Sequence, residues 1–255
     1  MAAHPRNFGD KWRKHEVLRR HPGLSSSMPE TRRLTRRSLK SMLRKYGMVY
    51  VKPVVGSLGN GVMKVEKRGN GLRFQLGLRK MRFAGIGAGY AAIVRAGRRK
   101  PYLVQRGIRL ATYRGRPYDI RVMVQRTPLR PWTVTGMVGR VAPPRKIVTN
   151  GSQGGTIYPV SALIPNGAGL RRRMSRIGLL AARRLHAAYP GLVEIGLDIA
   201  IDRRGKPWVL EANTRPDPCP FTKLPSRHML RRIMQFHKPW GIKRGLHCVK
   251  AKRGI

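Results

Sequence analysis

The stretch that decides the fold is Gly196-Leu197-Asp198-Ile199-Ala200-Ile201-Asp202-Arg203-Arg204-Gly205-Lys206-Pro207-Trp208-Val209-Leu210-Glu211-Ala212-Asn213. Two apolar runs flank a polar turn at residues 202–206, a pattern that predicts a β-hairpin. Side chains two positions apart on a strand share a face, so we expect Glu211 and Asn213 to point the same way. Asp198 lies on the paired strand and can come opposite them, depending on the register.

These three side chains are typical of a magnesium site. Two carboxylates and an amide carbonyl are hard oxygen ligands, which Mg²⁺ prefers, with phosphates and waters completing its octahedron. The apolar neighbours indicate a buried sheet, where unpaired carboxylates are costly. The alternative is that Asp198 and Glu211 pair with arginines at a sheet edge, and the spacing alone leaves both interpretations open.

The charge balance of the chain makes its acidic residues informative. The 255 residues include 55 Lys+Arg and 10 Asp+Glu, a formal charge of +45, and half of the acids lie between positions 194 and 217. Such a charge predicts attraction to nucleic acid, anionic lipid, acidic polymers and nucleotide phosphates without choosing among them. Composition bias alone is the alternative. Nucleic acid is not favoured, because no zinc-finger spacing, RNA-binding aromatic signature or heptad zipper is present.

The length fits one large domain or two small lobes, and 41% apolar residues are enough for a core. No apolar run approaches the ~20 residues of a membrane span, and the polar segment 1–6 lacks a signal-peptide pattern. Two cysteines are too few for a disulfide framework or a four-cysteine zinc module. Cys219, between two prolines, is expected to be an apolar filler rather than a reactive thiol. We therefore expect a soluble intracellular chain in a reducing compartment.

A second motif is Val51-Lys52-Pro53-Val54-Val55-Gly56-Ser57-Leu58-Gly59-Asn60-Gly61. A lysine on a strand followed by a glycine-rich turn can hold phosphates, because backbone N–H groups approach the oxygens and the ammonium supplies a charge. The motif is not a Walker A loop, since its lysine precedes the glycines. The alternative is that the glycines serve hairpin geometry only.

Elsewhere the pattern predicts a helix that ends at Gly47, strands over residues 119–125 and 133–141, and an amphipathic helix over residues 170–189. Residues 72–100 are basic and glycine-rich, so we expect weak structure there. The stretch from about Pro239 onward is expected to be a frayed basic tail.

Together the pieces resemble an ATP-grasp domain. The spacing of Asp198, Glu211 and Asn213 is similar to the metal signature of the D-alanine–D-alanine ligases and glutamate ligases of that superfamily. More closely, residues 8–240 resemble the spore-coat-associated YheC/YheD family of ATP-grasp proteins. The resemblance is carried by Asp10-Lys11-Trp12, Met28-Pro29-Glu30-Thr31, Val49-Tyr50-Val51-Lys52-Pro53, Tyr102-Leu103-Val104-Gln105, Tyr118-Asp119-Ile120-Arg121-Val122 and Trp208-Val209-Leu210-Glu211-Ala212-Asn213-Thr214-Arg215-Pro216.

The resemblance implies an α+β ATP-grasp fold of two α+β lobes with a nucleotide cleft between them. On this basis we expect a helical lead-in at 1–47, a small lobe with the glycine loop at 48–115, a large lobe with the metal hairpin at 116–240 and a basic tail at 241–255.

The resemblance also implies ATP and Mg²⁺ as cofactors and assigns roles to individual residues. Lys11 and Lys52 would contact the phosphates, under a loop that includes Gly56, Ser57, Gly59 and Gly61. Gln105 and Ile108 would lie at the adenine, and Asp198, Glu211 and Asn213 would carry the metal. Arg121 and Arg140 are the candidates for catalytic contact with phosphate or acyl phosphate. Asn150 and Gly154-Gly155 resemble the glycine loop of the glutamate-ligase branch.

The implied activity is that of an ATP-dependent carboxylate–amine ligase acting through an acyl phosphate, for which the protein supplies positioning and charge neutralisation. An acidic or polymeric substrate would suit the basic surface, and spore-coat components are the other implied partners. The implied location is the cytoplasm or the spore coat of a spore-forming bacterium. The alternatives are a nucleotide-binding coat protein without catalysis, or a polyanion binder.

Overall fold

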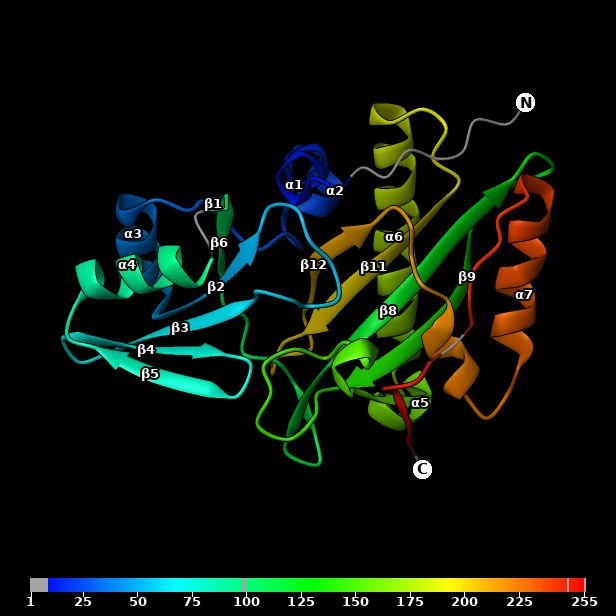
Figure 1. Ribbon diagram of the computed structural model, residues 1–255. Coiled ribbons are helices and arrows are strands. Elements are labelled where there is room, and N and C mark those ends of the chain that lie inside the picture. The colour runs from blue at the N-terminus through cyan, green and yellow to red at the C-terminus, as the bar shows by residue number, and fades with distance from the viewer. Residues whose placement is uncertain (1–8, 98–99, 247, 255) are drawn as a thin grey trace.

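The computed structural model describes residues 9–97, 100–246 and 248–254, so the polar segment 1–6 lies outside the described residues. Two sheets lie side by side, with helices packed against each of them (Figure 1). Within the described residues every strand pairing is antiparallel except the one between β10 and β13. This arrangement confirms the predicted α+β class.

The first sheet has the order β1-β6-β2-β3-β4-β5. Its strands are β1 (Thr31–Arg33), β2 (Met48–Pro53), β3 (Met63–Arg68), β4 (Gly71–Leu76), β5 (Arg79–Phe83) and β6 (Tyr102–Arg106). The second sheet has the order β12-β11-β8-β9-β10-β13, with β7 paired to β8. Its strands are β7 (Thr112–Tyr113), β8 (Arg116–Thr127), β9 (Arg130–Val141), β10 (Thr156–Tyr158), β11 (Glu194–Ile201), β12 (Pro207–Asn213) and β13 (Lys252–Arg253).

The helices fall between these strands. The α-helices are α1 (Lys11–Arg19), α2 (Pro22–Ser25), α3 (Arg36–Tyr46), α4 (Ile86–Ala96), α5 (Val160–Leu163), α6 (Ala168–Ala188) and α7 (His228–His237). Short 3₁₀ turns form η1 (Gly151–Gln153), η2 (Cys219–Lys223) and η3 (Lys238–Trp240). The helix predicted to end at Gly47 is confirmed as α3, whose last turn is closed by that glycine at φ 68°.

The first sheet is covered on one face by α3 and α4 (Figure 1). Strand β2 alternates, so that Val49 and Val51 are buried in the apolar core with these helices while Tyr50 and Lys52 face away from it. The face that carries Lys52 is therefore left for the cleft between the two sheets.

The second sheet is covered on both faces. Val122 and Val124 of β8 pack toward α6, whereas Met123 packs with Ile233 of α7 and with Phe221 of η2. Figure 1 shows α6 and α7 against this sheet. The predicted strands 119–125 and 133–141 and the helix 170–189 are confirmed as β8, β9 and α6.

The predicted hairpin is confirmed as β11–β12. Asp202 shapes its turn, because one of its oxygens accepts the backbone N–H groups of Arg204 (2.9 Å) and Lys206 (3.0 Å), and Gly205 takes φ 77°. The register pairs Asp198 with Glu211 and then shifts at the next residue. This irregularity is a β-bulge next to the cleft.

The expectation of weak structure over residues 72–100 is wrong. Two hairpin strands, β4 and β5, and the helix α4 occupy this region. Leu72, Phe74 and Ile93 are buried in the core of the first sheet, while Arg79 and Arg82 are exposed on β5. Three buried apolar anchors are enough to order a basic segment.

Two expectations about the C-terminal part are also wrong. Cys219 and Cys248 form a disulfide instead of remaining unpaired, which joins the segment after β12 to the end of the chain. The stretch after residue 240 is not frayed throughout, since β13 pairs with β10 and Ala251 is buried. No helix in the described ranges combines the length and apolarity that crossing a membrane would require.

Candidate functional site

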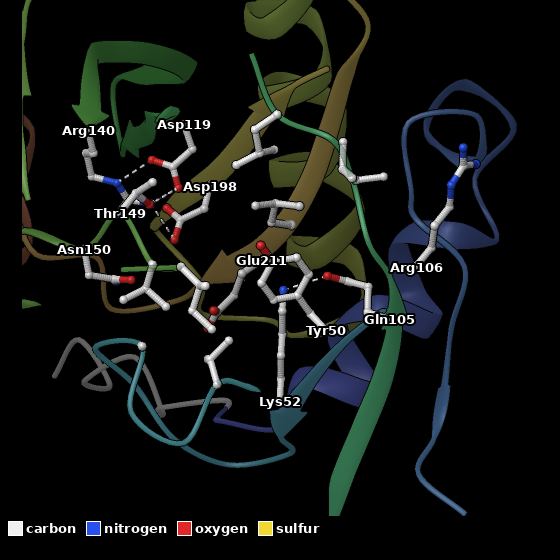
Figure 2. Close-up of a pocket in the computed structure, with 17 residues that line it drawn as sticks. Tyr50, Lys52, Gln105, Arg106, Asp119, Arg140, Thr149, Asn150, Asp198 and Glu211 are labelled. Atoms are coloured by element: carbon white, nitrogen blue, oxygen red, sulfur yellow. Dashed lines mark hydrogen bonds and ion pairs between the residues drawn. The ribbon is translucent and has the colours of Figure 1, made fainter. Parts of the chain in front are cut away.

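A cavity lies between the two sheets, with an empty volume of about 700 Å³ when its open mouth is included. Its wall combines apolar and charged side chains, and Figure 2 shows Arg140, Asp119 and Asp198 grouped on one side of it, away from Gln105 and Arg106. The lining residues are Tyr50, Lys52, Gly59, Val62, Gln105, Arg106, Ile108, Leu110, Asp119, Arg140, Ile147, Val148, Thr149, Asn150, Asp198, Leu210 and Glu211.

Lys52 enters this cavity from the first sheet. Its Nζ donates to Gln105 Oε1 at 2.6 Å, and the amide nitrogen of Gln105 donates in turn to Thr31 Oγ1 at 3.1 Å. Burial lowers the pKa of Lys52, and the nearby carboxylate of Glu211 opposes this effect. The chain of hydrogen bonds fixes the ammonium on the cleft face of β2.

The second sheet contributes a network of two carboxylates and two arginines, of which Figure 2 shows Asp119, Asp198 and Arg140. Arg140 donates to both oxygens of Asp119 at 2.8 and 2.6 Å and lies 3.0 Å from Asp198 Oδ2. Arg121 Nε donates to Asp198 Oδ1 at 2.6 Å, and the hydroxyl of Thr149 donates to Asp119 at 2.7 Å. All five side chains are buried, so the charges are compensated within the network.

The network fixes the ionisation of Asp198 and Arg140. Burial by itself would raise the pKa of Asp198, but Arg121 and Arg140 outweigh it and lower this pKa to about 2. Burial likewise opposes the charge of Arg140, but Asp119 and Asp198 more than compensate and raise its pKa. Asp198 is therefore a fixed negative charge whose two oxygens are both engaged by arginines.

Glu211 is placed differently from Asp198, although the two are cross-strand partners. The nearest cation is Lys11, whose Nζ lies 3.5 Å from Glu211 Oε1, and the side chain keeps 23% of its exposure. Because of the bulge, the adjacent residues Leu210 and Glu211 both line the cavity, which a regular strand would not allow.

The donor set fits Mg²⁺ shared with phosphates. Among the described residues no three His, Cys, Asp or Glu side chains gather closely enough to hold a metal by themselves. Magnesium in nucleotide sites is typically held by one or two carboxylates, with phosphates and waters completing its shell. Glu211 and Asp198 are such a pair, and Glu211 is the one whose oxygens are less engaged. Asn213 does not line the cavity, and its amide nitrogen lies 3.5 Å from the carbonyl oxygen of Gly196.

The glycine-rich loop spans the cleft at the mouth of the cavity. Lys11 Nζ donates to the carbonyl of Gly56 at one end of the loop. At the other side, Gln153 Nε2 reaches Leu58 O at 3.3 Å and Asn60 Oδ1 at 2.9 Å. The loop from the first sheet therefore contacts the 150–153 segment of the second.

Gly59 lets the loop approach this closely. Its φ is +74°, and a Cβ at this position would lie 2.9 Å from Asn150 Oδ1. A side chain here would meet both backbone strain and a polar neighbour.

The apolar part of the cavity wall is built from both sheets. It consists of Val62, Ile108, Leu110, Ile147, Val148 and Leu210. These side chains offer a flat aromatic base an apolar environment within the same cavity as the carboxylates and Lys52.

The structure brings many of the predicted site residues to this cavity but not all. Its lining includes Lys52, Gly59, Gln105, Ile108, Arg140, Asp198, Glu211 and Asn150. Lys11 lines a neighbouring cavity together with Lys52 and Glu211. Arg121 does not line the cavity but donates a hydrogen bond to Asp198, which does. Gly56, Ser57, Gly61 and Asn213 do not line it.

Other lining residues were not assigned a role by the sequence. Asp119 carried a signal, as one of ten acids in a chain of 255 residues. Thr149 and the apolar Leu110, Ile147 and Val148 carried none, because threonines are common on any surface and aliphatic residues in any core.

Solved ATP-grasp structures share the fold. Carboxyaminoimidazole ribonucleotide synthase from Aspergillus clavatus, in complex with ATP, matches 97% of this chain and 55% of its own, with a TM-score of 0.59 and 12% identity. The biotin carboxylase domain of 2-oxoglutarate carboxylase from Hydrogenobacter thermophilus, in complex with MgADP, matches 94% of this chain and 46% of its own, with a TM-score of 0.57 and 18% identity. These likenesses confirm the predicted ATP-grasp fold.

Two curated proteins of Bacillus subtilis are similar in sequence. Endospore coat-associated protein YheD is 29% identical over 221 residues, which cover 83% of this chain and 49% of YheD. Endospore coat-associated protein YheC is 22% identical over 220 residues, which cover 83% of this chain and 61% of YheC. The chain thus spans about half the length of the curated relatives it matches. The YheC/D like ATP-grasp family model matches residues 2–238, and the chain belongs to this family.

Proposed function

We propose that the cleft binds Mg-ATP and that the chain is an ATP-dependent carboxylate–amine ligase acting through an acyl phosphate. The observation that carries the proposal is the composition of one cavity, which is lined by apolar side chains together with Lys52 and the carboxylate pair Asp198 and Glu211. An adenine and a metal-bound triphosphate need these two environments side by side.

In this proposal the base packs against the apolar side chains, next to Gln105 and Ile108. The triphosphate extends toward Lys52 and Lys11, under the loop that contains Gly59. Both ammonium groups lie near Glu211. Lys11 Nζ is 3.5 Å from Glu211 Oε1, and Lys52 and Glu211 line the same nucleotide cavity. Two lysines and the backbone N–H groups of the loop would neutralise phosphate charge.

Glu211 would be the principal metal ligand, with Asp198 as the second carboxylate. The bound ion would supply charge neutralisation to the phosphates during transfer. Asn213 could join the ligands only after releasing its position against Gly196, since it does not line the cavity.

The reaction has two transfers. The terminal phosphoryl group passes from the nucleotide to a carboxylate oxygen of the substrate, leaving ADP. An amine nitrogen then attacks the acyl carbon, phosphate leaves, the nitrogen loses a proton and an amide forms. Arg140 and Arg121 act here as positioning residues, because both are held by buried carboxylates and fix Asp198.

The relatives support this proposal. One solved ATP-grasp neighbour with a TM-score of 0.51 is the D-alanine–D-alanine ligase of Coxiella burnetii, which is 14% identical to this chain. The names of YheC and YheD lead us to propose an association with the endospore coat. Because the chain spans about half of these relatives, the activity of the whole protein is included in the proposal.

A nucleotide-binding coat protein without turnover is the second candidate. The observation that favours it is the engagement of both Asp198 oxygens by arginines, which leaves Glu211 as the one less-engaged carboxylate of the pair. A protein of this kind would bind the nucleotide and use the cleft as a structural switch or joint.

A thermal-shift series with ATP, ADP and AMP, each with and without Mg²⁺, tests the binding. Release of ADP and phosphate is then measured with panels of carboxylic acids and amines. Magnesium-dependent stabilisation with substrate-dependent ADP release is expected. Stabilisation without release would support the coat protein instead. If the chain shows no thermal shift with nucleotides but binds nucleic acid with a steep salt dependence, both the ligase and the nucleotide-binding coat protein are ruled out.

A further inference from the structure

A second cavity lies beneath helix α1, next to the nucleotide cleft. Its empty volume is about 440 Å³ with its opening, and it shares Lys52, Gln105, Leu210 and Glu211 with the cleft. The rest of its wall is largely apolar and includes Leu18, Met28, Leu103, Val209 and Ala212. The proposed function uses only Lys11, Lys52 and Glu211 of this wall and leaves the space around Lys14 without a ligand.

Lys14 is the unusual member of this wall. It is 5% exposed, and its ammonium group makes no hydrogen bond or ion pair with any residue in the described part of the chain. The ammonium nitrogen is not among the fully enclosed, unpartnered atoms of the described residues, so it keeps contact with the cavity space, where a bound anion would reach it. Burial lowers the pKa of Lys14 to about 8, with Glu211 opposing this effect and Lys11 adding to it.

The charge balance of the cavity is positive. Lys11, Lys14 and Lys52 line it, against the single carboxylate of Glu211. Lys52 donates to Gln105, and Lys11 donates to Gly56 and lies near Glu211. Lys14 therefore lacks the acceptor that the other two lysines have.

His15 adds no charge to this cavity near neutral pH. Burial lowers its pKa to about 4, so the ring is neutral near pH 7. The cavity thus combines a partnerless cation with apolar walls, which is the environment that suits a small organic anion.

We propose that this cavity binds the carboxylate substrate of the ligase and that Lys14 is its ion-pair partner. The proposal rests on the proposed function, since it places the carboxylate beside Lys52 and Glu211, where the phosphates would end. Lys14 does not line the nucleotide cavity, so the triphosphate is not its partner there.

The walls also define the class of substrate. Lys14 repels an ammonium group, and the one carboxylate of the cavity, Glu211, already lies near Lys11 and is assigned to the metal. A free α-amino acid, whose ammonium group adjoins its carboxylate, is therefore disfavoured. The expected substrate is a monocarboxylate with a compact apolar body and no positive charge next to the carboxyl group.

Anion binding would leave a proton signature. An anion beside Lys14 favours its charged form and raises its pKa, so binding at about pH 9 takes up protons that the empty site lacks. The groups that bear on Lys14 from the surrounding elements are Asp10, Lys11 and His15 of the α1 segment, Lys52 of β2, Asp198 of β11 and Glu211 of β12. Of these, Lys11 and Glu211 form an ion pair, with 3.5 Å between Lys11 Nζ and Glu211 Oε1.

Isothermal titration of the full chain with sodium butyrate tests the proposal. Lys14→Met is expected to weaken butyrate binding about tenfold or more while changing Mg-ATP affinity less than about twofold. Arg13→Met, an exposed neighbour on the same helix, removes the same charge and is expected to change neither affinity. Lys14→Arg keeps the cation and should retain most of the butyrate binding.

Proton uptake by the wild-type chain provides a measurement that needs no variant. Butyrate titrations at about pH 9 in two buffers of different ionisation enthalpy should differ in apparent heat, and those at about pH 6 should not. Equal butyrate affinity in Lys14→Met, no proton uptake, or tighter binding of inorganic phosphate than of butyrate would each overturn the carboxylate site.

The two proposals fail in different ways. If wild-type chain binds butyrate through Lys14 but gives no response to Mg-ATP, the ligase proposal fails and the anion site stands. If Mg-ATP binds and butyrate does not, the substrate site is wrong while nucleotide binding stands. n-Butylamine, which has the same body with a positive head, should not bind in either case.

Discussion

Asp198 and Glu211 face each other across the β11–β12 hairpin, yet their carboxylates have opposite surroundings. Asp198 is 6% exposed and has an arginine on each oxygen, whereas Glu211 has Lys11 at 3.5 Å. Asp198 is a fixed charge inside an ion-pair network, whereas Glu211 can give up its contact with Lys11 and bind a metal ion instead. This difference orders the predictions about the hairpin.

Glu211→Gln is expected to weaken Mg-ATP binding about tenfold or more, because an amide keeps the shape but loses the charge that attracts the metal. Calorimetric titration of Mg-ATP against the folded variant measures the effect. Glu16→Gln is the control, since Glu16 pairs with Arg19 on the outer side of α1. An unchanged affinity in Glu211→Gln would show that Glu211 is not a metal ligand.

Asp198→Asn is expected to destabilise the fold by about 3–5 kcal/mol near neutral pH, because it leaves two buried arginines without their shared partner. The folded pKa of Asp198 is lowered to about 2 from its usual value of 3.8, so its contribution is present above that usual value and is lost as pH falls toward 2. Urea unfolding at a series of pH values should show the gap to wild type narrowing by roughly 2 kcal/mol between these limits.

The same series contains its own control. Glu16→Gln removes an exposed pair and should cost less than about 1 kcal/mol at any pH. If the gap between wild type and Asp198→Asn stays constant down to about pH 2, the ion-pair network does not govern the titration of Asp198.

Gly59→Ala is expected to weaken nucleotide binding by hindering loop closure. The new Cβ would lie 2.9 Å from Asn150 Oδ1, at a φ of +74°. Gly77→Ala is a matched control, because Gly77 has φ +59° and a Cβ there would meet nothing within 4 Å, so this variant carries the backbone strain alone. Stopped-flow binding of a fluorescent ATP analogue compares the two, and equal effects would remove the contact with Asn150 from the explanation.

The sequence was sufficient to predict the hairpin and the fold class because local signals and long-range pairing agree there. Asp202 and Gly205 form the turn, and the apolar runs on each side supply both strands. The same agreement holds for Val49 and Val51, whose alternation with Tyr50 and Lys52 separates the core face from the cleft face.

The site could be predicted only in part, since register and bulges depend on tertiary packing. The bulge that brings Leu210 and Glu211 to one cavity has no signal in the sequence. Period-two alternation predicted Asn213 beside Glu211, but Asn213 pairs opposite Gly196 and does not line the cavity. Lys14 was one basic residue among many until its burial was known.

The disulfide between Cys219 and Cys248 is expected to stabilise the chain, because it closes a segment with a sequence separation of 29 residues that includes α7. The chain-entropy relation gives about 3–4 kcal/mol for a loop of this size. The double variant Cys219→Ser, Cys248→Ser should lose about this much in urea unfolding, and a reducing agent should lower the stability of wild type but not of the variant. Thiol titration of denatured, unreduced wild type should find neither cysteine reactive. Two reactive thiols in that assay would show that the cysteines are unpaired and would return Cys219 to the role of an apolar filler.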